Sequence, residues 1–183
     1  MGVSVVLQIG HTELRGGAKN KLTGINEYTL NSLITPQIQE RLSKLGISSE
    51  IISGAYWRLP TLINKLEPKL CLSLHCNGFK DPSVGGKEFL YHHKSSKGKK
   101  FAEVLSKQFE DFYVNDRGIK PRVKGDRGFR LLDKTKCPIV IAELIFITNN
   151  EDLHYFVSAA DDVIRSYTQA IHRTLRESKE LNK

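Results

Sequence analysis

Continuous apolar runs constrain the fold of this chain more than any other feature of its sequence. The strongest is PIVIAELIFI at residues 138–147, and VSVVLQI at residues 3–9 has the same character. Apolar residues at consecutive positions, many of them β-branched, are typical of strands that are covered on both faces of a parallel sheet. Two further runs, at residues 69–75 and 87–92, fit the same interpretation. The sequence therefore predicts buried strands at these four places.

Segments with helical periodicity separate these runs. In residues 26–45 apolar side chains recur every three or four positions, and Gly46 follows as a stop signal. Residues 96–112 and about 161–175 show similar spacing. Strands that alternate with helices indicate an α/β fold, so we expect a single domain with a twisted, largely parallel sheet of about six strands flanked by helices on both faces. Short strands are also expected at residues 50–53 and 129–132, and a basic loop at residues 115–129.

The length of 183 residues corresponds to one ordinary domain. We expect residues 1–176 to form it and residues 177–183 to be a polar tail. No stretch approaches the roughly 18 consecutive apolar residues of a membrane-spanning helix, and no basic residue precedes the apolar N-terminal run as it would in a secretory signal. We therefore expect a protein made in the cytoplasm. Its three cysteines form no C-x-x-C pair, which favours reduced, buried thiols.

The charge of the chain predicts a polyanionic partner. Its 28 Lys and Arg residues exceed its 20 Asp and Glu residues, for a net charge of +8. Most of the surplus lies in residues 117–136, and a second basic cluster occupies residues 92–100. Such runs are more often simply solvated surface than binding patches. A nucleic-acid-binding module is an alternative, but the sequence shows no known reader motif, so we expect no nucleic acid partner.

Three residues that can bind metal stand where a predicted strand ends or a predicted helix begins. His11 follows the first apolar run, Glu27 opens the first long helix, and His75 ends the run KLCLSLH. Ligands of open α/β sheets bind beyond the carboxyl ends of the strands, so these residues can share one crevice. Two imidazoles and one carboxylate are a typical ligand set of catalytic zinc. Singly, each is better explained as a hydrogen-bonded boundary residue or a first-turn carboxylate than as a metal ligand.

Glu143 stands inside the strongest apolar run. Burial of a carboxylate in so apolar a strand is costly unless the group is paired, bound or used. One interpretation is a buried ion pair with one of the many basic residues. The other is catalysis, in which Glu143 holds and deprotonates a water molecule and then passes the proton to a leaving amine.

Four segments in this order, IGHTELRGGA, INEYTLN, SLHCN and AELIFITNNED, resemble the signature segments of the zinc-dependent N-acetylmuramoyl-L-alanine amidases of the Amidase_3 family. The resemblance covers roughly residues 4–175. It implies that His11, Glu27 and His75 bind one zinc ion per chain and that Glu143 is the catalytic carboxylate. The implied reaction is hydrolysis of the amide bond between N-acetylmuramic acid and L-alanine in peptidoglycan.

Substrate contacts are expected from three further residues. Asn77 alternates with His75 along one predicted strand and so shares its face, although a turn residue before Gly78 is an equally good interpretation. Arg122 and Arg130 belong to the basic run, and an arginine can clamp the carboxylates of stem peptides. Peptidoglycan is therefore the expected partner.

Many phage endolysin catalytic domains belong to the family that the sequence resembles. A cell-wall hydrolase without a signal peptide has to leave the cytoplasm by another route, and release at host lysis is the phage solution. We therefore expect a monomeric phage or prophage endolysin that acts on the cell wall after release. Two alternatives stay open: a zinc peptidase that cuts within the stem peptide, and a non-enzymatic module that binds cell wall or another polyanion.

Overall fold

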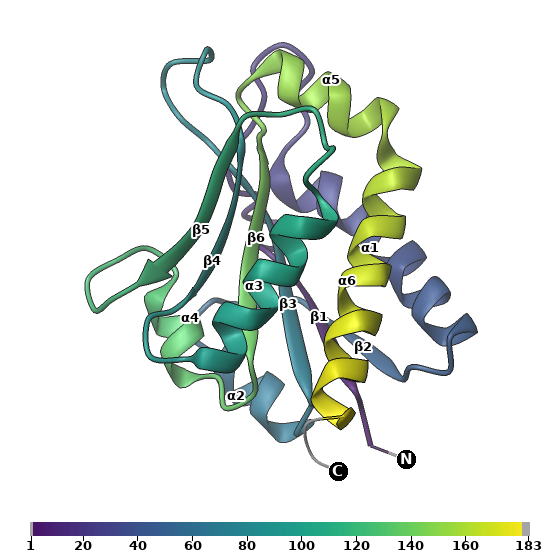
Figure 1. The fold of residues 1–183 in the computed structure, drawn as a ribbon. Coiled ribbons are helices and arrows are strands. Elements are labelled where there is room, and N and C mark those ends of the chain that lie inside the picture. The colour runs from purple at the N-terminus through teal and green to yellow at the C-terminus, as the bar shows by residue number, and fades with distance from the viewer. Residues whose placement is uncertain (1, 181–183) are drawn as a thin grey trace.

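The computed structural model describes residues 2–180, in which six strands form one sheet (Figure 1). In chain order they are β1 (Val5–Ile9), β2 (Ser49–Ile52), β3 (Leu70–Asn77), β4 (Lys87–His92), β5 (Asp116–Arg122) and β6 (Ile139–Phe146). Their order across the sheet is β2-β1-β3-β6-β4-β5. The first four of these are parallel, whereas β4 and β5 run the opposite way. The predicted α/β domain with a largely parallel sheet is confirmed.

Helices cover both faces of this sheet (Figure 1). They are α1 (Glu27–Lys44), α2 (Leu59–Lys65), α3 (Ser96–Gln108), α4 (Phe129–Lys134), α5 (Asn150–Ser158) and α6 (Ala160–Glu180). Helices α1, α3 and α6 share one face, where the larger hydrophobic core joins them to the strands. The short helices α2 and α4 contact each other over a smaller core on the other face. The sheet thus has one thick helical layer and one thin one.

The central strands show why their sequences are apolar at consecutive positions. Every residue of β1 and β6 is buried. Alternate residues face opposite cores: Val5 and Leu7 belong to the larger core, and Val6 belongs to the smaller. A strand covered on both faces needs apolar residues at every position. The four predicted buried strands are confirmed, each with ends within two residues of those expected.

The side chain of Asn26 caps the start of helix α1. The Asn26 side chain accepts a hydrogen bond of 2.9 Å from the backbone N–H of Thr29, which satisfies a free donor of the first turn. Leu30 and Ile38 are buried against the larger core, so the packing of the helix fixes its orientation. Glu27 is its first residue, where the helix dipole favours a carboxylate.

Residues 115–132 differ from the prediction. The expected loop contains strand β5, and the expected strand at residues 129–132 is the start of helix α4. Strand β5 is an edge strand paired only with β4, and an edge tolerates Gly118 and Pro121, which argue against a strand in the sequence. Leu131 and Leu132 are both buried. Two adjacent apolar residues in so short a segment do not distinguish a strand from a helix.

Helices α2 and α5 are absent from the sequence-based prediction. Helix α2 has seven residues, too few to show a helical period. Helix α6 extends to Glu180, so residues 177–180 of the expected tail continue this helix, and the rest of that tail lies outside the described residues. Within residues 2–180, no helix is both long and apolar enough to cross a membrane.

Candidate active site

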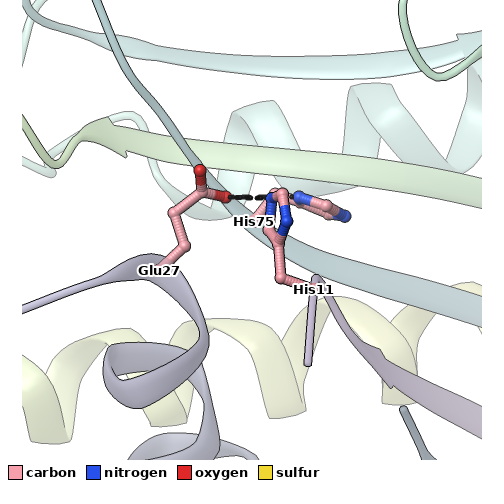
Figure 2. A group of neighbouring side chains, drawn as sticks. All are labelled: His11, Glu27 and His75. Atoms are coloured by element: carbon pink, nitrogen blue, oxygen red, sulfur yellow. Dashed lines mark ion pairs between the residues drawn. The ribbon is translucent and has the colours of Figure 1, made fainter. Parts of the chain in front are cut away.

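Three side chains that can bind metal meet at the carboxyl ends of β1 and β3 (Figure 2). His11 follows β1, Glu27 opens α1, and His75 lies near the end of β3. The Oε2 atom of Glu27 is 3.1 Å from Nε2 of His11 and 3.4 Å from Nδ1 of His75. Each residue offers a ligand atom within 4.8 Å of the others, and no other such group occurs in residues 2–180. The predicted convergence of these residues is therefore present in the fold.

The backbone beside the cluster is shaped to admit the two imidazole rings. His11 has a φ of 66°, in the left-handed region that non-glycine residues rarely adopt. A Cβ atom on Gly10 would lie 2.4 Å from Cε1 of His75. Gly17 has a φ of 82°, and a Cβ atom there would lie 2.6 Å from Cδ2 of His11 and 2.8 Å from Cδ of Glu27. Glycine at both positions leaves the space that the three side chains occupy.

Glu27 is buried and tightly held. Its Oε1 atom accepts a hydrogen bond of 2.7 Å from the backbone N–H of Ala18, and its Oε2 atom accepts one of 3.3 Å from that of Cys76. Burial alone would raise the pKa of this carboxyl, but hydrogen bonds and charge from His11 and His75 outweigh burial and hold the pKa at about 2. The hydrogen bond to Glu27 in turn raises the pKa of His11. Glu27 is thus an anion between two imidazoles.

The cluster fits a divalent metal ion by its chemistry and its access. Two imidazole nitrogens and a carboxylate oxygen are donors that divalent transition metals accept. The side chains of His11 and His75 are 35% and 17% exposed, whereas that of Glu27 is 6% exposed. The carboxylate is therefore buried, whereas the two imidazoles are partly open to solvent. This arrangement leaves room for further ligands beside the three residues.

Glu143 lies on β6 with 5% of its side chain exposed. Its Oε1 atom is 3.0 Å from Nη2 of Arg127, and its buried Oε2 atom has no hydrogen-bond partner among the described residues. Burial raises the pKa of this carboxyl, while the charges of His75 and Arg127 act against the rise. A buried carboxylate oxygen without a hydrogen-bond partner costs folding free energy, which makes Glu143 a candidate functional residue.

A hydrogen-bond network continues behind Glu143. The Nδ2 atom of Asn77 donates to Oε1 of Glu88 over 3.0 Å, and Oδ1 of Asn77 accepts from Nη2 of Arg127. Glu88 is buried and also pairs with Nε of Arg117 at 3.2 Å and with Nη2 of Arg122 at 3.5 Å. The buried charges of this region are therefore compensated by arginines.

A groove of about 1090 Å³ opens over the cluster and Glu143. Its apolar lining includes Leu59, Leu90 and Ile141. Tyr56 and Trp57 also line it and are 45% and 67% exposed. A groove of this size with a few convergent polar groups is the usual form of a ligand site.

A known protein family matches most of this chain. The N-acetylmuramoyl-L-alanine amidase family, Amidase_3, matches residues 5–173. The chain belongs to this family. The N-acetylmuramoyl-L-alanine amidase LytC of Bacillus subtilis (strain 168) is 26% identical over 160 residues, which make up 83% of this chain and 31% of LytC. The chain thus spans about a third of the length of this curated relative.

Solved amidase structures share the Amidase_3 fold seen here. An N-acetylmuramoyl-L-alanine amidase from Clostridium difficile 630 has a TM-score of 0.84 at 20% identity and covers 96% of this chain and 97% of its own. AmiC2 of Nostoc punctiforme gives 0.83 at 20% identity, with 95% and 97% covered. The catalytic domain of the CD27L endolysin, which targets Clostridia difficile, gives 0.77 at 20% identity, with 96% of this chain and 97% of that domain covered. At these identities the likeness shows the fold.

Four residues singled out in the sequence line one groove in this Amidase_3 domain. They are His11, Glu27, His75 and Glu143. They come from three different strands or strand ends and from one helix start, so only the fold brings them together. Their roles as zinc ligands and catalytic carboxylate stay predictions.

The three expected substrate contacts are placed differently from one another. Arg130 is exposed and lines the groove. Asn77 is buried and is bonded to Glu88 and Arg127. Arg122 is bonded to Glu88 and is not part of the groove lining. Substrate contact by these residues stays a prediction, and the position of Arg130 favours it most directly.

Sequence reasoning missed Arg127 as a site residue of this Amidase_3 domain. It is one of eight basic residues in 117–136, and nothing in that run distinguishes it from its neighbours. The aromatic pair Tyr56 and Trp57 stood in a segment with no assigned structure. Two adjacent aromatic residues in a loop before Pro60 were the only signal that this loop lines a site.

Proposed function

We propose that the chain is a zinc-dependent amidase that hydrolyses the bond between the lactyl group of N-acetylmuramic acid and L-alanine in peptidoglycan. The observation that carries this proposal is the meeting of His11, Glu27 and His75 in one groove with Glu143, whose Oε2 atom is buried and free. Membership of the N-acetylmuramoyl-L-alanine amidase family supports the choice of bond. The name of the relative LytC supports it as well.

Zinc is the metal that suits this donor set, because its catalytic sites commonly have three nitrogen or oxygen ligands from the protein. His11, Glu27 and His75 would hold it. When bound, zinc supplies Lewis-acid activation of water and of the scissile carbonyl. The pKa of about 2 keeps Glu27 ionised at neutral pH, and the backbone N–H of Ala18 fixes the orientation of its carboxylate.

Glu143 performs the proton transfers in this proposal. Its free Oε2 atom takes a proton from the attacking water and then delivers it to the alanine nitrogen as the C–N bond breaks. Burial raises the pKa of Glu143, which makes the protonated carboxyl a usable intermediate. The charges of His75 and Arg127 oppose the rise and favour the ionised form at the start of the cycle.

Digestion of purified peptidoglycan tests the reaction. We expect new N-terminal L-alanine amino groups, one zinc ion per chain, loss of cleavage after chelation and recovery after zinc is restored. Cleavage within the stem peptide would expose a different amino group. That result would show that the chain is a zinc peptidase and not an amidase. A protein that retains peptidoglycan and cleaves nothing would be a binding module.

We also propose a lytic role after release to the cell wall, as expected of a phage or prophage endolysin. The fold of the CD27L endolysin catalytic domain, matched over 96% of this chain, supports it. Purified protein added to permeabilised bacteria of the host type should lower their turbidity, and the Glu143→Gln variant should not. Turbidity that stays constant while isolated peptidoglycan is cleaved would count against a lytic role.

A further inference from the structure

Arg127 is exposed and yet reaches a buried carboxylate. It lies in the loop at residues 123–128 between β5 and α4, and 62% of its side chain is exposed. Its Nη2 atom is 3.0 Å from Oε1 of Glu143, whose side chain is 5% exposed. The same nitrogen donates to Oδ1 of Asn77. A long side chain loses rotamer entropy when it holds two such contacts. The hydrogen bonds that Arg127 makes to Glu143 and Asn77 have to compensate this loss.

Glu88 fixes the orientation of the Asn77 side-chain amide. Its Nδ2 atom donates to Oε1 of Glu88, which cannot donate in return when it is ionised. The amide oxygen of Asn77 therefore faces Arg127. Glu88 is itself held by Arg117 and Arg122. The direction of every bond from Glu88 to Arg127 is thereby determined.

Glu88 and Glu143 lie opposite each other in the antiparallel register of β4 and β6. Their side chains share one face of the sheet, where two ionised carboxylates would repel each other. Arg127 places a positive charge beside Glu143. Asn77 is hydrogen-bonded to both Arg127 and Glu88 and so links the two. Oε1 of Glu143 is thus occupied, while Oε2 is free.

We propose that Arg127 is a positioning residue: held by Asn77, it fixes Glu143 through Oε1 and reserves Oε2 for the proton transfers. This inference rests on the proposed amidase function. It assigns the two oxygens of one carboxylate to different tasks, one to an ion pair and one to the reaction.

Three single variants of the full, zinc-loaded chain test the inference with muramoyl-peptide fragments of peptidoglycan as substrate. Arg127→Ala should lower kcat about tenfold to a hundredfold with little change in KM, because misplacement of a proton-transfer group slows the chemical step. The acidic limb of its pH profile should move to higher pH, because the positive charge that lowers the pKa of Glu143 is gone. Arg127→Lys keeps the positive charge, so the acidic limb of the pH profile should return to its wild-type position and kcat should partly recover. Lys124→Ala, an exposed basic residue of the same loop, is the matched control and should change none of these values.

A second readout does not depend on activity. In ¹³C-labelled, metal-free protein, the Glu143 carboxyl signal, assigned by its loss in Glu143→Gln, should titrate at higher pH in Arg127→Ala than in the wild type. An unchanged titration together with an unchanged kcat would overturn the inference. A rise in KM alone would also overturn it, because Arg127 would then contact substrate instead of positioning Glu143. A wild-type protein that leaves the muramoyl–alanine bond intact would refute the proposed function, while the titration would still show whether Arg127 holds Glu143.

Discussion

His75 and Glu143 lie directly opposite each other in the register of the parallel strands β3 and β6. Opposite positions on neighbouring strands direct their side chains to the same face, and both side chains line the groove. A predicted metal ligand and the predicted catalytic carboxylate are therefore held by the backbone ladder of two buried strands. Each can be replaced while the ladder keeps the other in place, so their roles can be tested separately.

Glu143→Gln should keep zinc and lose turnover. The amide has nearly the shape of the carboxyl but cannot take up the proton, and general acid–base catalysis is worth about a hundredfold to ten-thousandfold in rate. His75→Ala should lose both zinc and turnover. Zinc content and release of N-terminal L-alanine measure the two effects. Full activity of the Gln variant would remove Glu143 from the mechanism.

Gly17→Ala should weaken metal binding. The added Cβ atom would stand 2.6 Å from His11 and 2.8 Å from Glu27, so at least one of these side chains has to move. The positive φ adds a cost of about 1–2 kcal/mol in unfolding free energy. Gly46→Ala is the matched control, because Gly46 has a φ of 70° but nothing lies within 4 Å of its Cβ position. Both variants should lose stability in urea, and only Gly17→Ala should lose zinc affinity.

The metal-free Glu143→Gln variant should be more stable than the wild type at neutral pH. Burial raises the folded-state pKa of Glu143, so the ionised form opposes folding. The carboxyl is neutral below its unfolded pKa, where Glu and Gln should be equally stable. The advantage of Gln should develop as the pH rises from the unfolded pKa to the folded pKa, and it should persist above the folded pKa. Urea unfolding at pH 4 and pH 7.5 measures this, and an advantage at pH 4 alone would reverse the sign.

No cysteine should react quickly in the folded protein. Cys71 and Cys76 are buried, and burial raises their pKa values well above the usual range. Burial raises the pKa of the half-buried Cys137 to about 12, so about one thiol in ten thousand is ionised at pH 8. A thiol reagent should label all three in urea and none within minutes in buffer. Rapid labelling of the native protein would show that one thiol is more exposed than in this structure.

Exposed lysines should contribute to retention on cell wall. Lys94, Lys97, Lys134 and Lys136 are exposed members of the two basic clusters. Replacement of all four by glutamine removes four positive charges and should release the protein from peptidoglycan at lower salt, because such contacts are screened by ions. Cleavage of small soluble fragments should be unaffected. Equal retention of variant and wild type at every salt concentration would assign the charge to solubility alone.

The predictable part of the fold is the part with strong periodicity. Strands β1, β3, β4 and β6 are apolar runs, and α1 has both a cap and a long apolar stripe. Strand β5 and helix α4 were not recognised because their stability comes from neighbours. Strand β5 is held by its ladder with β4, and α4 is held by contacts with α2, β4 and β6. Local sequence carries little of that information.

The predictable part of the site is the part with unusual chemistry for its place. A carboxylate in an apolar strand and histidines at strand ends are visible without a structure, and resemblance joined them into one set. Arg127 and Glu88 are not visible in this way. An arginine in a basic loop and a glutamate at the start of a strand are ordinary residues, and their value depends on which side chains they meet in space.

Strand β6 has a place in the sheet that links folding to activity. It is the last strand in the chain, yet it lies between β3 and β4 and alone connects the half formed by β2, β1 and β3 to the half formed by β4 and β5 (Figure 1). These two halves share no ladder until β6 inserts between them. Because β6 also carries Glu143, the strand that completes the sheet is also the one that brings the predicted catalytic carboxylate into place. We therefore expect a nascent or truncated chain that ends before residue 139 to have every predicted metal ligand but to lack the predicted proton-transfer group, and so to be inactive.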